Sequence, residues 1–244
     1  MQDVEQPDSE EVYVLKIRIK FAKTGSMKFI GHLDVMRYFQ KAMRRAEVDI
    51  AYSEGFSPHQ KMSFAQPLGV GLTSSGEYFD IEANSTQSSQ EMIKRLNAVM
   101  VEGMEVLDYK RLPDDSKNAM ASIYAADYKV VFREKYKPDI DIKTEFEKFM
   151  SQDTITIVKK TKKSEREIDI KEFILDYKVD QEVIFLKTNA SSGNNLKPDL
   201  VMKAFVEYEG IEYNKFMIMV ERLDLYGYEN EKFISLNDYG ETIY

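Results

Sequence analysis

Cysteine and tryptophan are absent from this 244-residue chain, and histidine occurs only twice. The absence of cysteine excludes disulfide bonds, iron–sulfur ligation and cysteine nucleophiles. No apolar run reaches the roughly 18 residues that a membrane-spanning helix needs. Residues 1–11 lack the basic and apolar blocks of a signal peptide. We therefore expect a cytoplasmic protein with no membrane partner and no resident cofactor.

The residues that are present indicate a folded chain. Hydrophobic residues make up 43% of the sequence and aromatic residues 12%, which is a globular composition and not a disordered one. The length suits one large domain or two small ones, each able to bury its own core.

The net charge of −8 conceals an uneven distribution. Residues 12–62 hold ten basic and four acidic side chains, a net charge of +6, so the rest of the chain carries −14. The basic residues of this segment are Lys16, Arg18, Lys20, Lys23, Lys28, Arg37, Lys41, Arg44, Arg45 and Lys61. A basic surface on an acidic protein indicates an anionic partner, although solvated strand and helix faces would give the same pattern.

Hydrophobic periodicity predicts strands and helices in both halves of the chain. Residues 12–21 alternate apolar and basic side chains, which is typical of a strand with one cationic face. The first half is predicted to form strands at 12–21, 77–82 and 105–112, a strand-and-loop region at 52–68, and helices at 32–46 and 88–100. The second half is predicted to form strands at 125–132, 154–159, 173–179, 183–188 and 216–225, helices at 140–151 and 196–209, and a loosely packed tail at 226–244.

The order β-α-β-β-α-β in each half is that of a ferredoxin-like fold. We predict an α+β protein made of two tandem ferredoxin-like domains with antiparallel sheets. A flexible lead-in covers residues 1–11, the N-terminal domain covers 12–117 and the C-terminal domain covers 118–244, with a polar break at 113–117 between them.

Both histidines fall in the basic segment. His32 stands at the start of a predicted helix, where free N–H groups attract anions and lower the pKa of a histidine. His59 follows Pro58 in a loop, a common place for ligand contacts. The candidate catalytic residues are His32 and His59, and the candidate ligand-binding residues are His32, Asp34, Arg44, Arg45, Ser53, Ser57, His59, Lys61 and Glu82. An ordinary helix start and an exposed loop histidine are the structural alternatives.

Metal binding and nucleophilic catalysis are weaker interpretations of the same residues. His32, Asp34 and His59 are the types found in a two-histidine, one-carboxylate site. Residues two positions apart on a helix point in different directions, so we expect no metal there. Proximity alone favours Ser53 or Ser57 as a nucleophile beside His59. The run 69–71 (GVG) lacks phosphate-loop spacing and is predicted to form a tight turn that could lie against a polyanion.

A second basic cluster, residues 159–166 (KKTKKSER), is expected at a hairpin tip, where it is either a phosphate contact or a solvated turn. The predicted nucleic-acid contacts are Lys16, Arg18, Lys20, Arg37, Lys41, Lys160, Lys162, Lys163 and Arg166. The aromatic residues available for base stacking are Tyr38, Tyr52, Phe56 and Phe64.

Three segments carry a resemblance to a known family. They are KFIGHLDVMRYFQKAMRRAEVDIAYSEGFSPHQKMSFAQPLGVGLTSSGEYFDIE, KTKKSEREIDI and LKPDLVMKAF. Together they resemble the radical SAM-linked protein family, a domain of unknown function that is fused to radical SAM enzymes or encoded beside them. The family has Ser before His-Leu-Asp, where this chain has Gly31, so a possible helix cap is missing. The resemblance implies a radical SAM enzyme as partner and implies no mechanism.

Three functional hypotheses follow. The first is an RNA-binding or RNA-modification accessory module that acts with a radical SAM enzyme, with no DNA expected. The second is a protein–protein adaptor for that enzyme without a ligand of its own. The third is a hydrolase or transferase that uses His32 and His59. A single cleft that gathers both histidines with Arg44, Arg45, Lys61 and Glu82 would favour a ligand site, and their scatter over separate faces would favour the adaptor.

Overall fold

The computed structural model describes residues 14–160 and 165–244. The elements of the first half are β1 (Leu15–Lys23), η1 (Gly25–Phe29), α1 (His32–Arg45), β2 (Met62–Phe64), β3 (Thr73–Ala83), α2 (Ser89–Asn97), β4 (Met104–Arg111) and α3 (Ala119–Ser122). Helix α2 begins at Ser88, whose side chain accepts a hydrogen bond from the Glu91 N–H. Helix α1 has Gly31 at that position and no side-chain cap, as its sequence implies.

The second half contains more elements than its sequence pattern indicates. They are β5 (Ala125–Phe132), η2 (Glu134–Tyr136), α4 (Ile142–Met150), β6 (Thr156–Lys160), β7 (Glu165–Asp169), η3 (Lys171–Phe173), β8 (Ile174–Asp180), β9 (Val183–Asn189), α5 (Pro198–Tyr208), β10 (Ile218–Glu229), β11 (Lys232–Ser235), η4 (Leu236–Tyr239) and β12 (Glu241–Thr242). Strand β7 was not predicted, and β6 pairs with it in a separate two-stranded ribbon outside the main sheet.

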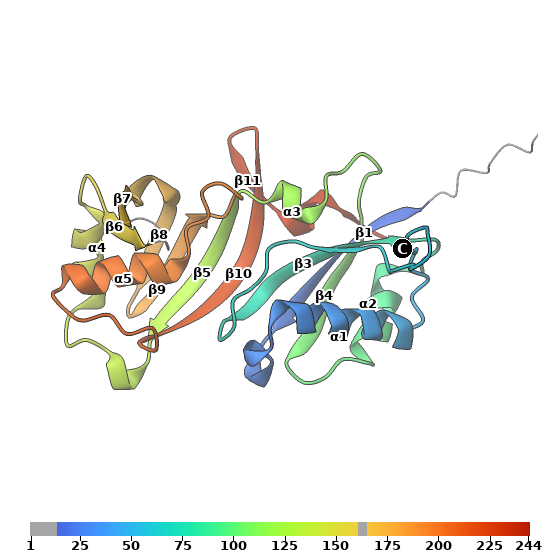
Figure 1. Cartoon of the computed structure of the whole chain (residues 1–244), viewed down its shortest axis with the longest axis horizontal. Coiled ribbons are helices and arrows are strands. Elements are labelled where there is room, and N and C mark those ends of the chain that lie inside the picture. Colours follow the sequence, from blue (N-terminus) through green and yellow to red (C-terminus); the bar gives the residue numbers. More distant parts are fainter. Residues whose placement is uncertain (1–13, 161–164) are drawn as a thin grey trace, which may run out of the picture.

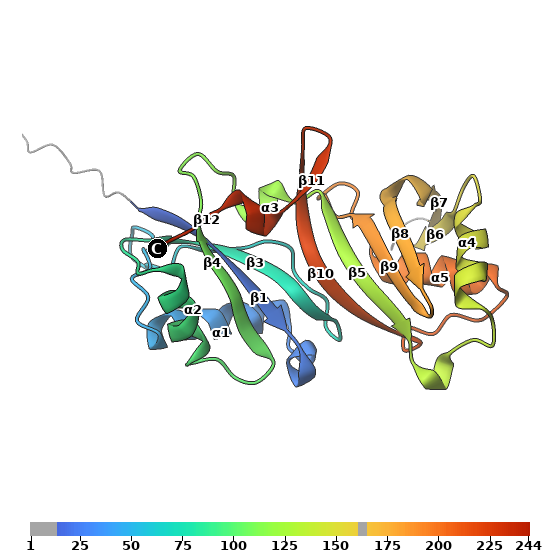
Figure 2. The same ribbon diagram turned by 180° about the vertical axis from the view of Figure 1, so that it is seen from behind.

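One ten-stranded sheet connects the two halves (Figure 1, Figure 2). Its strand order is β12-β4-β1-β3-β10-β5-β9-β8, with β2 on β3 and β11 on β10. The two halves meet where β3 and β10 pair in parallel over two residue pairs, and the other pairs are antiparallel. The prediction of an α+β protein with a mostly antiparallel sheet is therefore confirmed.

Each half buries its helices against its own part of the sheet. In the first half, Phe39 of α1 and Leu96 of α2 are fully buried with Ile17 and Ile19 of β1. In the second half, Phe146 of α4 packs on Phe205 of α5 with the ring centres 5.0 Å apart. Figure 1 shows α4 and α5 covering one face of β5, β9 and β8, and Figure 2 shows the opposite face of these strands without a helix.

The tail is ordered, so the prediction that residues 226–244 pack loosely is wrong. Strand β10 runs on to Glu229 and turns into β11 through Asn230 and Glu231, which both have positive φ. Two central residues with positive φ make a hairpin turn that fits the twist of the strands. The sequence Asn-Glu does not predict such a turn, whereas Asn-Gly would. The chain then returns to the first half, where β12 pairs with β4.

The predicted helices match α1, α2, α4 and α5 to within about two or three residues at each end. Of the predicted strand-and-loop region 52–68, only Met62–Phe64 forms a strand. In residues 14–160 and 165–244, no helix combines the length and the apolar character needed to cross a membrane.

Candidate functional site

His32, the first residue of α1, is partly buried. Its ring meets the Phe64 ring edge-on, with the ring centres 5.5 Å apart. It lines a cavity of about 10 Å³ together with Lys23 and Glu77. Burial is the main cause that lowers the pKa of His32, Glu77 opposes the shift and Lys23 adds to it. The imidazole is therefore neutral at pH 7, and the cavity has room for one water molecule at most.

His59 lies in a different place, on the exposed loop between α1 and β2. Its Nδ1 lies 2.7 Å from the Ser53 Oγ, its backbone N–H donates to the same oxygen at 3.1 Å, and the Ser53 N–H donates to the His59 carbonyl at 2.8 Å. These contacts close a small loop that also exposes Ser57. In the described part of the chain no carboxylate bonds to His59, so the pair lacks the third member of a catalytic triad.

Lys61 and Glu82 lie beside this loop and form an ion pair of 2.6 Å. Five positions separate Glu82 from Glu77, which acts on His32, so these two glutamates lie about 17 Å apart along β3. Arg44 and Arg45 are exposed at the far end of α1, about 20 Å from its first residue.

The structure thus separates the predicted ligand-binding residues into three groups. His32 stands alone at the cavity, and Ser53, Ser57, His59, Lys61 and Glu82 share the loop region. Asp34 pairs with Arg37 at 3.5 Å on the exposed side of α1, which also carries Lys41, Arg44 and Arg45. Among the described residues, no group of three or more acidic or histidine side chains could hold a metal ion.

Strand β1 does not present the predicted cationic surface. Arg18 is 2% exposed and donates two hydrogen bonds to the Asp80 carboxylate, at 2.8 and 2.9 Å. Lys20 pairs with Asp224 at 3.4 Å, and Lys16 donates to the backbone carbonyls of Asp114 and Ser116. Arg18 is therefore an interior structural cation, and the prediction of an exposed basic face on β1 is wrong at this position because the tail covers it.

The second basic cluster lies at the β6–β7 ribbon. These strands pair antiparallel with Lys160 opposite Glu165, as expected for a hairpin, and Arg166 is exposed on β7. Lys162 and Lys163 lie outside the described residues.

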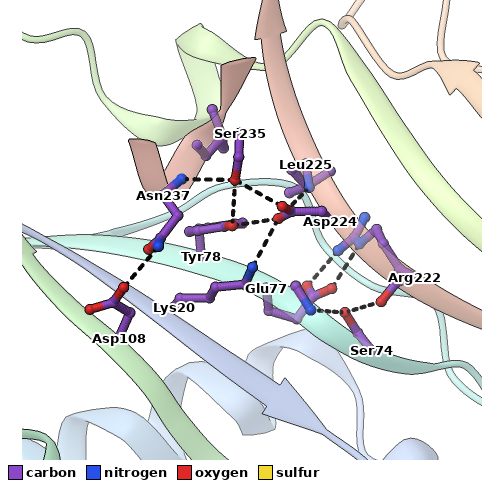
Figure 3. Close-up of polar contacts among 12 residues, drawn as sticks. Lys20, Ser74, Glu77, Tyr78, Asp108, Arg222, Asp224, Leu225, Ser235 and Asn237 are labelled. Atoms are coloured by element: carbon purple, nitrogen blue, oxygen red, sulfur yellow. Dashed lines mark hydrogen bonds and ion pairs between the residues drawn. The ribbon is translucent and has the colours of Figure 1, made fainter. Parts of the chain in front are cut away.

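A buried polar network joins the halves beside the β3–β10 pair (Figure 3). Arg222 of β10 is 1% exposed and forms a two-pronged ion pair with Glu77 of β3, one bond of which is 2.7 Å long. The same guanidinium donates to the side chain and the carbonyl of Gln66, at 2.9 and 2.8 Å. The Ser74 hydroxyl donates to the Arg222 carbonyl at 2.9 Å. These bonds fix the start of the loop 66–72 against β10.

A cleft of about 640 Å³ opens directly beside Arg222, between the two halves. The first half contributes Lys28, Phe29 and the loop 66–72, and the second half contributes Tyr128, Arg133, Asn195, residues 197–199, Tyr213, Lys215, Phe216, Ile218, Val220 and Arg222. The Gly71 N–H donates to the Lys28 carbonyl at 2.7 Å, and Gly71 has a φ of +92°, so glycine allows the loop to turn back onto η1.

Among the described residues, four of the five cations that line this cleft lack acidic partners, and the fifth, Arg222, pairs with Glu77. In the described part of the chain, no ion pair involves Lys28, Arg133, Lys197 or Lys215. The Nε of Arg133 is buried with no hydrogen-bond partner. Asp199 is the sole carboxylate in the lining. Four unpaired cations and one carboxylate give a local charge of about +3 in a chain of net charge −8.

Exposed hydrophobic side chains surround the same cations. Phe29 is 66% exposed, Val70 is 61% exposed and Phe216 is 57% exposed, and all three line the cleft. The ammonium groups of Lys28 and Lys215 lie 5.1 Å from the ring centres of Phe29 and Phe216, respectively. The cleft therefore offers positive charge and open aromatic faces together, which suits an anionic ligand with a planar group.

The sequence predictions include only one wall of this cleft. The Gly-rich turn was identified as a segment that could lie against a polyanion, and it does line the cleft. The facing wall was missed because Arg133, Lys197 and Lys215 are scattered over 83 positions in an acidic half. The pairs Lys28-Phe29 and Lys215-Phe216, each a cation beside an aromatic residue, were the available signal.

The comparison with known protein families gives one result. Residues 16–198 match the model of a family described as "Uncharacterized protein conserved in bacteria (DUF2344)". No curated protein matches the chain.

Proposed function

This chain belongs to the DUF2344 family of uncharacterized proteins conserved in bacteria, and we propose that it binds single-stranded RNA in the cleft between its two halves. The observation that carries the proposal is the set of four unpaired cations, Lys28, Arg133, Lys197 and Lys215, around exposed aromatic rings. Proteins that bind single strands combine a cationic groove with aromatic faces on which bases stack.

The dimensions and charge of the cleft support a nucleotide ligand. A volume of about 640 Å³ lies within the range of sites that enclose small organic groups. Phe29 and Phe216 come from opposite halves, so each wall of the cleft carries an exposed ring. Each cation that meets a phosphate releases bound counterions, so binding should weaken as salt rises. For four contacts to a single strand, the slope of log K against log salt should be about −3.

The experiment compares two variants with the same change in charge. The cleft variant carries Gln at Lys28, Arg133, Lys197 and Lys215, and the control variant carries Gln at Arg37, Lys41, Arg44 and Arg45 on α1. Fluorescence anisotropy of a labelled short RNA, at about 0.1 M salt, measures binding. The proposal expects the cleft variant to lose most of its affinity and its salt slope, and the control to retain both. An equal loss in the two variants, or a larger loss in the control, would refute the cleft as the RNA site.

We also propose that the RNA-binding module acts with a radical SAM enzyme, as the resemblance of its sequence implies. One structural observation favours a docking role in addition. Phe56 is fully exposed at the tip of the loop that the Tyr52–Gln60 bridge and the Ser53–His59 contacts close. An aromatic side chain held out on an ordered loop is a typical interface anchor. Co-purification with the enzyme should be lost with Phe56→Ser and retained with Tyr177→Ser, and retention in both would contradict the docking role.

We interpret each half as one ferredoxin-like unit. The strand orders β4-β1-β3-β2 and β10-β5-β9-β8, both antiparallel, support this interpretation, with the β6–β7 ribbon as an insertion in the second unit. An experimental structure with a parallel β1–β3 or β5–β9 pair would contradict it.

A further inference from the structure

Asp199 is the exception in the cleft, because it places a negative charge among four cations. It lies in the first turn of α5, next to Lys197 and Pro198. In residues 14–160 and 165–244 it makes no ion pair and no hydrogen bond, although Arg133, Lys197 and Lys215 line the same cleft. Its two carboxylate oxygens are therefore available to a ligand.

The carboxylate lies close to aromatic side chains of the cleft. Burial raises the pKa of Tyr213 to about 12, and the negative charge of Asp199 contributes to that shift. Asp199 acts in the same direction on the buried Tyr128, which also lines the cleft. A ligand bound in the cleft beside Tyr213 and Tyr128 would therefore lie beside Asp199.

Helix stability explains the position of Asp199 only in part. An acidic residue in the first turn stabilises a helix through the helix dipole. That role does not require the side chain to face a ligand-sized cleft, and it does not account for a carboxylate that forms no pair with the cations around it. A carboxylate in a site for phosphates would weaken binding unless it accepts hydrogen bonds from another part of the ligand.

The hydrogen-bond donors on the edge of each base determine which base can bind a carboxylate. The Watson–Crick edge of guanine presents two adjacent donors, N1–H and N2–H, which match the two oxygens of one carboxylate. The corresponding edges of adenine, cytosine and uracil place a donor beside an acceptor, which a carboxylate would repel. On this basis we propose that Asp199 selects guanine, so that the ligand of the cleft is single-stranded RNA with an unpaired guanine. This inference rests on the proposed RNA binding.

The experiment measures anisotropy with uridine-rich RNAs that carry one central guanosine, inosine, adenosine or cytidine. Wild-type protein should bind the guanosine RNA at least tenfold more tightly than the adenosine and cytidine RNAs. Inosine, which lacks the N2 amino group, should fall in between. Asp199→Asn should remove the preference for guanosine without weakening the other RNAs. Glu207→Gln, at the other end of α5, is the control of equal charge and should keep the preference.

Other outcomes would separate the two proposals. If wild-type protein binds all four RNAs equally, or if Asp199→Asn keeps the preference for guanosine, the selection by Asp199 is refuted while RNA binding stands. If no RNA binds, the proposed function fails and the inference fails with it. Unchanged melting temperatures of the variants would show that any lost preference does not come from unfolding.

Discussion

The ion pair between Arg222 and Glu77 offers the sharpest test of how the two halves are held together. The two side chains are 2% and 7% exposed, so neither charge is hydrated. The guanidinium also donates to the side chain and the carbonyl of Gln66. Replacing Arg222 by Met would keep an elongated side chain but leave the Glu77 carboxylate and the Gln66 acceptors without their donor.

The expected cost follows from that isolated charge. Breaking a buried pair by removing one partner destabilises a protein by about 3–5 kcal/mol, because the remaining charge stays desolvated. The positive charge of Lys23 lies near Glu77 and partly compensates the Glu77 carboxylate. We therefore expect Arg222→Met to lower the free energy of unfolding by about 3 kcal/mol, the lower end of that range. For a chain of this size, that corresponds to a melting temperature lower by roughly 6–12 °C.

Urea unfolding followed by circular dichroism measures the change in the free energy of unfolding. The double variant Glu77→Leu with Arg222→Met should recover most of the loss, since no buried charge is left unpaired. The matched control is Lys203→Met, which breaks the exposed Lys203–Glu207 pair of 3.7 Å and should cost less than about 0.5 kcal/mol. If Arg222→Met costs no more than this control, the junction does not depend on the pair and the reasoning is wrong.

Two further predictions concern local features of the fold. Asp141 caps α4 by accepting a 2.7 Å hydrogen bond from the Thr144 N–H, and this bond lowers the pKa of the Asp141 carboxyl. The carboxylate therefore stabilises the fold above its ordinary pKa of 3.8, and this stabilisation is lost as the pH falls below that value. Asp141→Asn should therefore have a lower urea midpoint than wild type near neutral pH and a similar midpoint at about pH 3. An equal difference in midpoint between variant and wild type at both pH values would contradict this prediction. Gly76→Ala should cost about 1–3 kcal/mol in urea unfolding, because a Cβ at this position would overlap the Leu223 carbonyl across the junction, and an unchanged midpoint would refute the close approach.

The fold was largely predictable wherever one periodicity continued over many residues. Helix α1 was found because Val35, Phe39 and Met43 recur on one stripe, and β1 because Ile17, Ile19 and Phe21 alternate with cations. The tail was not found, because its strands are short, the Asn-Glu turn between β10 and β11 carries no turn signal, and the partner of β12 is the distant strand β4. Leu236 is fully buried, although the residues on either side of it, Ser235 and Asn237, are polar.

The sequence predicted which kinds of side chain form the candidate site, but not where in the fold the site lies. The sequence favoured an anionic ligand held by cations and aromatic rings, and the cleft contains both. The predicted cations were taken from two dense segments, residues 12–62 and 159–166, yet Arg18 is buried against Asp80, and Arg44 and Arg45 lie at the other end of α1 from His32. Density of charge along a chain does not decide whether a side chain meets an acidic partner.

By itself, the sequence determined the four longer helices, most strands of the main sheet, the core residues on their periodic faces, and that cysteine chemistry is absent. These properties depend on neighbours along the chain and on residue type. The tertiary structure alone decided which cations remain unpaired. Arg222 forms an ion pair with Glu77, 145 positions away in the sequence, whereas Lys197 and Lys215 form no ion pair with a carboxylate within the described residues. It also created the cleft, because that cavity exists only where β3 and β10 bring the two halves side by side.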